Sequence, residues 1–255
     1  MSDADKQKGR IFLHRGDLAQ ARLSYEQALK DERQDGSPQA LSDILGNLGN
    51  VCAMLGDYSE AERCYREILE LQRRQQDKTA IGQTLVNLGN LQAEAGRPDR
   101  AKAYYLEALD ILEPLQDRRA LGILYSTLAL HEASAGSTDQ AIVNFTKALE
   151  LHRAVGDEEG LAITYSQLGK TFLEAGKRRQ AEKCLNNASE HFIKLGDEPA
   201  EAAVLRLLAD LYAQAANKES AIRCLERVVL LDARYGLSQH SDDMDNLQRL
   251  VQGDV

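Results

Sequence analysis

The sequence predicts an all-α protein built from a repeated pair of helices. When the chain is compared with itself at an offset of 40 residues, six stretches align without gaps. Ala, Leu, Glu, Gln and Arg are plentiful while aromatic residues make up only 5%, a composition that favours helices over strands. Within each stretch the apolar residues recur at intervals of three and four, which is the period of an amphipathic helix.

Composition and charge exclude several classes of protein. Hydrophobic residues make up 43% of the 255 residues, enough to bury a core. The net charge of −9 argues against broad nucleic-acid binding, which needs a basic surface. The longest run of large apolar residues, 228–231, is far shorter than the roughly 20 that a membrane-spanning helix requires. Residues 1–5 show no secretory signal. We therefore expect a cytoplasmic protein that does not insert into a membrane.

Four columns of related residues, each spaced by 40 positions, define the repeat. The alanine column is Ala21, Ala61, Ala101, Ala141, Ala181 and Ala221, and the glycine column is Gly16, Gly56, Gly96, Gly136 and Gly176, with Ala216 in the sixth place. The aspartate column is Asp77, Asp117, Asp157 and Asp197, and the leucine column is Leu48, Leu88, Leu128, Leu168 and Leu208. These columns divide a single repeat domain, 1–237, into units 1–37, 38–77, 78–117, 118–157, 158–197 and 198–237, followed by a segment 238–255.

Unit 158–197 illustrates how each element is justified. Asp157 is placed to cap the N-terminus of a first helix, and Gly176 ends that helix because glycine adopts a left-handed turn without strain. A second helix is predicted from about Arg179 to Lys194, and Gly196-Asp197 ends it and caps the next helix. A column of small residues in the first helices is expected to face the alanine column, so that the helices approach closely: Gly49, Gly89, Ala129, Gly169 and Ala209.

The ends and one proline depart from the repeat. The first helix is expected to begin at a capping box over residues 2–5. Pro114 should end or kink the second helix of unit 78–117, because proline lacks the N–H that a helix interior uses. Residues 241–251 combine an N-cap, acids in the first turn and an apolar stripe, and predict a helix that covers the last unit.

The repeated motifs resemble the tetratricopeptide repeat (TPR). One half of the TPR pattern is present as Tyr165-x-x-Leu168-Gly169-x-x-Phe172, and the other as Ala61-x-x-x-Tyr65 and its equivalents. The unit of 40 residues is longer than the usual 34, as in Pins-type adaptors and bacterial TPR regulators, and the usual closing proline is absent. The resemblance implies a right-handed superhelical solenoid of six helix-turn-helix units plus a capping helix. It also implies that the first helices line a concave groove.

No motif in the sequence predicts catalysis or cofactor binding. The four cysteines form no CxxC pair, and Cys64, Cys184 and Cys224 share one repeat column, which indicates packing rather than metal binding. The five histidines are scattered singly. No nucleophile, base and orienting group are brought together by the repeat. We therefore expect a protein that is not an enzyme and that needs no cofactor and no metal.

Helical spacing selects the side chains that face the groove. The four asparagines are the sharpest signal, because an amide both donates and accepts hydrogen bonds and so suits the backbone of an extended peptide. The alternative is that they brace neighbouring helices. Ile123, Leu130 and Ile163 could form an apolar pocket or could pack between units. The predicted peptide-binding residues are Lys6, Arg10, Asn47, Asn50, Asn87, Asn90, Ile123, Ser126, Leu130, Ile163, Ser166, Gln167, Lys170 and Arg206.

The predicted function is that of a protein-protein interaction adaptor whose groove holds an extended peptide or a helix of a partner protein. The alternative is a homo-oligomeric scaffold that associates with itself. Lys6 and Arg10 resemble part of the carboxylate clamp of TPR proteins that bind chaperone tails. Gln83 and Asn87 stand where that clamp needs further basic residues, so the sequence argues against a chaperone co-factor.

Overall fold

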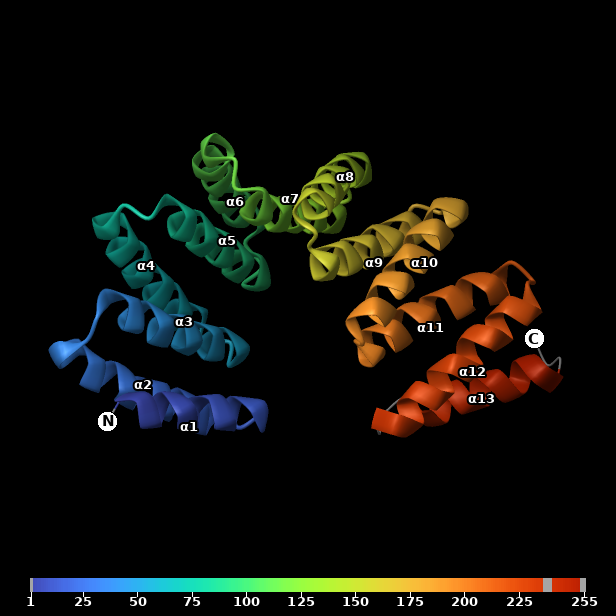
Figure 1. Ribbon diagram of the computed structural model, residues 1–255, viewed down its shortest axis with the longest axis horizontal. Helices are drawn as coiled ribbons and strands as arrows, with labels where there is room; N and C mark the ends of the chain where they lie inside the picture. Colours follow the sequence, from blue (N-terminus) through green and yellow to red (C-terminus); the bar gives the residue numbers. More distant parts are fainter. Residues whose placement is uncertain (1, 236–239, 253–255) are drawn as a thin grey trace. The chain divides into compact units, whose positions relative to one another are not determined.

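The computed structural model describes residues 2–235 and 240–252, which form thirteen α-helices, one 3₁₀ helix and no strand (Figure 1). The first six helices are α1 (Ser2–His14), α2 (Leu18–Asp35), α3 (Pro38–Met54), α4 (Tyr58–Gln75), α5 (Lys78–Glu94) and α6 (Pro98–Leu112). The 3₁₀ helix η1 (Glu113–Leu115) follows, and then α7 (Arg118–Ser134), α8 (Thr138–Val155), α9 (Glu158–Glu174), α10 (Arg178–Leu195), α11 (Glu198–Gln214), α12 (Lys218–Tyr235) and α13 (His240–Gln252). The all-α prediction is confirmed. No described helix is both long and apolar enough to cross a membrane.

The chain divides into two compact units, 1–124 and 125–255, and the boundary falls within α7. In the first unit each helix from α1 to α6 packs against the next one along the chain. In the second unit the same consecutive packing runs from α8 to α13. One continuous solenoid over residues 1–237 stays a prediction.

The predicted caps and turns explain where the helices begin and end. Asp77, Asp117, Asp157 and Asp197 each accept a hydrogen bond from the backbone N–H three residues later, at 3.0–3.1 Å. The predicted turn glycines, including Gly176 at φ +70°, adopt the left-handed conformation. Ala216 holds the same conformation with φ +55°, where an L-residue is strained.

Two of the predicted exceptions, the stop near Pro114 and the tail helix, are confirmed. The helix α6 stops at residue 112, and Pro114 lies in η1, because proline cannot continue the α-helical hydrogen bonding. The helix α10 agrees with its predicted limits within one residue at each end. The predicted tail helix is α13, which packs on α12 and buries Leu250 in a cluster with Leu225 and Ala221.

The small column and the alanine column both lie in the packed interior. The six residues of the alanine column are fully buried, and Ala129 shares a core cluster with Ala141, as Ala209 does with Ala221. A Cβ added to Gly89 would lie 2.3 Å from the ring of Tyr105, and one added to Gly169 would lie 2.7 Å from Leu185. The small column therefore makes room for the large side chain four residues after each alanine, which a helix places on the same face one turn on.

The four cysteines are free thiols of the packed interior. Cys52, Cys64 and Cys184 are buried, and Cys224 is half-buried. Burial raises the pKa of Cys52 to about 11 and the pKa of Cys64 to about 12, because a thiolate loses its hydration there. These thiols are therefore held in the protonated form that suits packing.

Candidate functional site

In the compact unit 1–124, the first helix of each repeat lines a hollow of about 890 Å³. Side chains from α1, α3 and α5, together with the C-terminal half of α4, form its walls. The hollow brings together five of the residues predicted from the sequence, Lys6, Arg10, Asn47, Asn50 and Asn87. It also contains amides that the prediction omitted: Gln7, Gln39, Gln72, Gln75 and Gln83. Residues that lie 81 positions apart in sequence, from 6 to 87, thus converge on one concave surface.

Three of the predicted asparagines already make hydrogen bonds within the protein. The hydroxyl of Tyr65 donates to the side-chain oxygen of Asn50. The hydroxyl of Tyr105 donates to Asn90 in the same way, at 2.8 Å. The amide of Asn47 donates to a backbone oxygen of its own helix at 2.9 Å. These contacts support the bracing alternative for Asn50 and Asn90, although both residues remain exposed.

Other amides of the hollow are unengaged. Gln7, Gln75, Gln83 and Asn87 are exposed, and their side chains form no hydrogen bond with any described residue. Exposed asparagine and glutamine on a helix surface contribute little to folding, and asparagine is a poor helix former. Four such amides in one hollow therefore provide donors and acceptors that the fold itself does not use.

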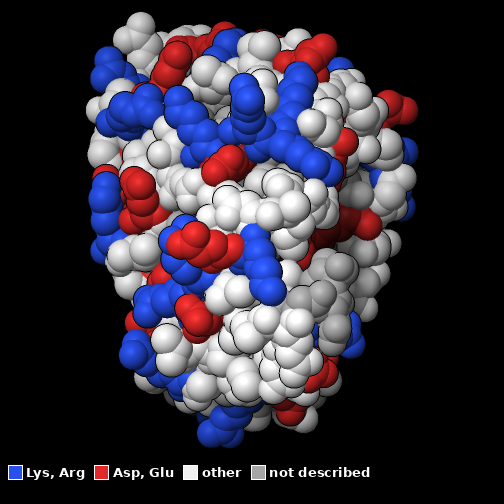
Figure 2. Space-filling model, turned by 90° about the vertical axis from the view of Figure 1, so that its right-hand side faces the viewer, with Lys and Arg blue, Asp and Glu red and all other residues white. Residues whose placement is uncertain are grey.

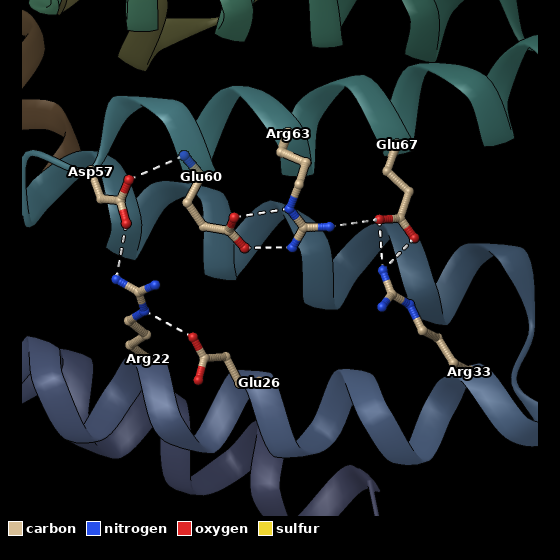
Figure 3. Close-up of polar contacts among 7 residues, drawn as sticks. All are labelled: Arg22, Glu26, Arg33, Asp57, Glu60, Arg63 and Glu67. Carbon is tan, nitrogen blue, oxygen red and sulfur yellow. Dashed lines mark hydrogen bonds and ion pairs between the residues drawn. The ribbon is translucent and has the colours of Figure 1, made fainter.

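The second helices of the same unit show the opposite arrangement (Figure 3). Arg22 of α2 donates to Asp57 at 3.1 Å and to Glu26 at 2.8 Å. Arg63 of α4 pairs with Glu60 and Glu67, and Glu67 in turn accepts two hydrogen bonds from Arg33 of α2 at 2.7 and 2.8 Å. Pairing with Arg63 lowers the pKa of Glu60. The seven charged side chains drawn in Figure 3 are thus paired within the chain.

In the second unit, the predicted residues lie on α7 and α9, apart from Arg206 on α11. Leu130 and Ile163 are exposed by 39% and 42%, as the apolar-pocket hypothesis requires, and Lys170 is also exposed. Ile123 is 48% exposed but belongs to the first unit. The hydroxyl of Ser126 is hydrogen-bonded to that of Thr164 at 2.9 Å, so Ser126 links α7 to α9.

The remaining predicted residues of α9 are Ser166 and Gln167, which are half-buried. The side-chain oxygen of Gln167 is buried without a hydrogen-bond partner among the described residues. Figure 2 shows one side of the molecule, on which basic side chains gather toward the top and acidic ones lie among them. At the start of α10, the ammonium group of Lys177 lies 3.6 Å from a carboxylate oxygen of Asp139 on α8.

Arg206 is engaged by the last two helices. Its guanidinium donates to both oxygens of Asp232 on α12, at 2.6 and 2.7 Å, and to Asp243 on α13, at 2.8 Å. Asp232 is fully buried and the side chain of Asp243 is 7% exposed. The prediction that Arg206 contacts a peptide did not take these partners into account. Asp243 could not be found from the repeat, because α13 lies outside it.

Family models match most of the chain. Two models, both described as tetratricopeptide repeat, match residues 40–113 and 120–194, and residues 166–236. The chain belongs to the tetratricopeptide repeat family. TPR proteins are protein-interaction scaffolds, and the family is generally non-catalytic. No curated protein matches the chain.

Solved structures share the TPR fold at low sequence identity. A signal-transduction ATPase with a tetratricopeptide repeat sensor from Pyrococcus horikoshii superimposes with a TM-score of 0.71 at 15% identity, over 97% of this chain and 41% of that one. The apo form of RapI gives a TM-score of 0.71 at 16% identity, over 91% and 65%. BtubC from P. vanneervenii gives 0.60 at 22% identity, over 74% and 78%. This chain thus spans under half of the ATPase, and these likenesses show the fold alone.

The tyrosine partners of the TPR asparagines could have been found from the sequence. Asn50 and Asn90 lie fifteen residues before Tyr65 and Tyr105. In the following repeat, Leu130 lies fifteen residues before Phe145. In these three repeats an amide thus occurs where the later ring carries a hydroxyl, and an apolar residue where it does not. A comparison of these two repeat columns, fifteen residues apart, would have shown this match.

Proposed function

We propose that this TPR protein is a non-enzymatic adaptor that binds an extended segment of a partner protein in the hollow of its first unit. The observation that carries this proposal is the set of unengaged amides that α1, α4 and α5 direct into one hollow of about 890 Å³. An extended chain presents an N–H and a C=O at every residue, and each of these groups needs a partner when it is bound. Primary amides supply both kinds of partner and tolerate many ligand sequences.

The proposal also covers the second unit. There Leu130 and Ile163 offer exposed apolar surface, and Ser166, Gln167 and Lys170 offer polar groups on the same helix as Ile163. In this unit Leu130 and Ile163 would accept an apolar side chain of the partner, as Ile123 would in the first unit. We place the protein in the cytoplasm, with no nucleic-acid partner and no insertion into a membrane.

The test uses a displayed library of random 20-residue peptides, selected on the full chain. Peptides selected by the wild type are measured against the double variant Gln83→Ala with Asn87→Ala. Each lost hydrogen bond is worth about 0.5–1.5 kcal/mol, so we expect an affinity loss of about tenfold. The matched control removes two exposed amides that lie outside the hollow, Gln34→Ala with Gln180→Ala, and should bind as the wild type does.

Two outcomes would contradict the proposal. If no peptide is selected, or if the hollow variant and the control bind equally well, the hollow is not a peptide site. The alternative, a homo-oligomeric scaffold, predicts a mass in light scattering that rises with concentration and returns to that of a monomer in the hollow variant. A monomer at every concentration supports the adaptor.

A further inference from the structure

Gly46 lines the hollow, and its surroundings leave room for a side chain there. It lies inside α3, where its backbone is that of an ordinary helical residue. Among the described residues, a Cβ added to Gly46 would meet a single atom of another helix within 4 Å, the Cδ1 of Ile68 at 3.9 Å. That separation is an ordinary van der Waals contact. Alanine would therefore fit at this position, and it would favour the helix, because glycine is the poorer helix former.

Other helical glycines of this chain have a packing reason that Gly46 lacks. At five of them an added Cβ would lie 2.2–2.8 Å from a side chain of a neighbouring helix, so that the neighbour would have to move. These five are Gly9, Gly82, Gly89, Gly160 and Gly169. The fold therefore accounts for a glycine at each of these positions, but not at position 46.

The repeat shows the same contrast. In every other repeat the column of Gly46 carries a side chain: Lys6, Val86, Ser126, Ser166 and Arg206. On the facing second helix, α4 carries Ile68 where the other second helices carry Ala or Val. Ile68 thus extends toward the bare position without filling it, since 3.9 Å still separates its Cδ1 atom from the place of a Cβ. The larger residue on α4 does not require a glycine on α3.

The surface at this point is apolar. Tyr65 lies one turn before Ile68 on α4, and its hydroxyl donates to a side chain of α3. Gln72 lies one turn after Ile68, and its side-chain oxygen accepts a hydrogen bond from Thr84 of α5 at 2.8 Å. Both hydroxyl hydrogens are thus used within the protein. Gly46 and Ile68 themselves present only carbon, so a polar side chain placed against them would give up water without gaining a hydrogen bond from either residue.

We propose that Gly46 and Ile68 form a notch that receives one apolar side chain of the partner segment, of the size of leucine, isoleucine, methionine or phenylalanine. Burial of that side chain supplies affinity, because apolar surface is removed from water. The unengaged amides of the same hollow, among them Gln83 and Asn87, bind the backbone of the segment. This inference rests on the proposed function and names the type of residue that the hollow selects.

The first experiment distinguishes a glycine that serves binding from one that serves the fold. Gly46→Ala should raise the midpoint of thermal unfolding by about 1–4 °C, because alanine fits the position and favours the helix. Gly89→Ala, the comparison, should lower the midpoint, because the ring of Tyr105 lies 2.3 Å from the place of the added Cβ. A midpoint that falls in both variants would show that the fold itself needs Gly46, and would overturn the inference.

The second experiment uses peptides that the wild type selects from the random 20-residue library. We expect these peptides to share one apolar position. Changing that residue to alanine in a synthetic peptide should weaken its binding to the wild type about tenfold, but its binding to Gly46→Leu by less than about twofold, since leucine already fills the notch. The unchanged peptide should bind about tenfold more weakly to Gly46→Leu and about threefold more weakly to Gly46→Ala.

The matched control is Ala103→Leu. It adds the same side chain at an exposed position of α6 outside the hollow, so it should bind the peptides as the wild type does. Circular dichroism checks that each variant is folded. If Gly46→Leu does not fold, Gly46→Ala carries the test alone, because its smaller side chain meets Ile68 at an ordinary distance.

The remaining outcomes separate this inference from the proposed function. Peptides that lose affinity to the Gln83 and Asn87 double variant, but bind both Gly46 variants as they bind the wild type, would overturn the inference and leave the proposed function standing. Selected peptides without a shared apolar position would do the same. An apolar residue whose loss weakens binding equally to the wild type and to Gly46→Leu lies elsewhere, which also overturns the inference. Failure to select any peptide would overturn the proposed function, and this inference with it.

Discussion

Arg206 and Arg10 each lie on the first helix of a repeat, on α11 and α1, and their surroundings differ. The side chain of Arg206 is 20% exposed and binds two buried carboxylates from α12 and α13. Arg10 is exposed, and no described carboxylate is paired with it. An arginine on the first helix of a repeat therefore stabilises the fold where a following helix supplies carboxylates. Where no such helix does so, its charge remains available for binding.

The largest effect that would test this comparison is expected from Arg206→Ala. Removing the guanidinium leaves Asp232 and Asp243 buried without a cation, which in comparable sites costs about 3–5 kcal/mol. Arg10→Ala removes no ion pair and should change the unfolding free energy by less than about 0.5 kcal/mol. Urea unfolding of the two variants measures both values. Equal losses would show that Arg10 is a structural residue too.

A smaller effect is expected in the pH dependence around Arg206. Burial raises the pKa of Asp243 above its ordinary value of 3.8, and Arg206 opposes that rise. The folded state thus holds this proton more tightly than the unfolded state. Its contribution to stability is complete below about pH 4 and is lost as the pH rises through the raised pKa.

Asp243→Asn isolates this contribution. The stability of the variant relative to the wild type should increase between pH 4 and pH 7, because the carboxyl of residue 243 loses its proton in the wild type and the amide of the variant has none to lose. Unfolding midpoints at several pH values, measured on both proteins, give the difference. A difference that stays constant, or that falls as the pH rises, would show that Arg206 outweighs burial at this carboxyl.

The smallest effect is expected from tyrosine to phenylalanine changes in the first unit. Tyr105→Phe removes the hydrogen bond to Asn90 and should cost about 0.5–1.5 kcal/mol. Tyr25→Phe removes a buried hydroxyl that has no described partner, so it should be neutral or should stabilise the protein by about 1 kcal/mol. Thermal unfolding of both variants tests this order. A loss at Tyr25 as large as that at Tyr105 would mean that the Tyr25 hydroxyl has an acceptor in the free protein.

The sequence predicted those features that depend on a single column of repeated residues. The aspartate caps, the turn glycines and the stop at Pro114 follow from the chemistry of a single residue and its neighbours, so the helix ends were found. The packing of Tyr105 and Leu185 on the small column was not predicted, because it required knowing how two helices rotate about their axes. The prediction for Arg206 did not include its partners, because one of them, Asp243, comes from the irregular helix α13.

The low exposure of the cysteines has a practical consequence for studies of folding. Cys52 and Cys64 belong to the first unit, and Cys184 and Cys224 to the second. A maleimide reacts with a thiolate that it can reach, so labelling of a buried thiol must wait for local opening. Mass spectrometry of timed labelling reactions on the unmodified chain would therefore clock the opening of each half separately. A bound partner that rigidifies only the first half would slow Cys52 and Cys64 and leave Cys184 and Cys224 unchanged.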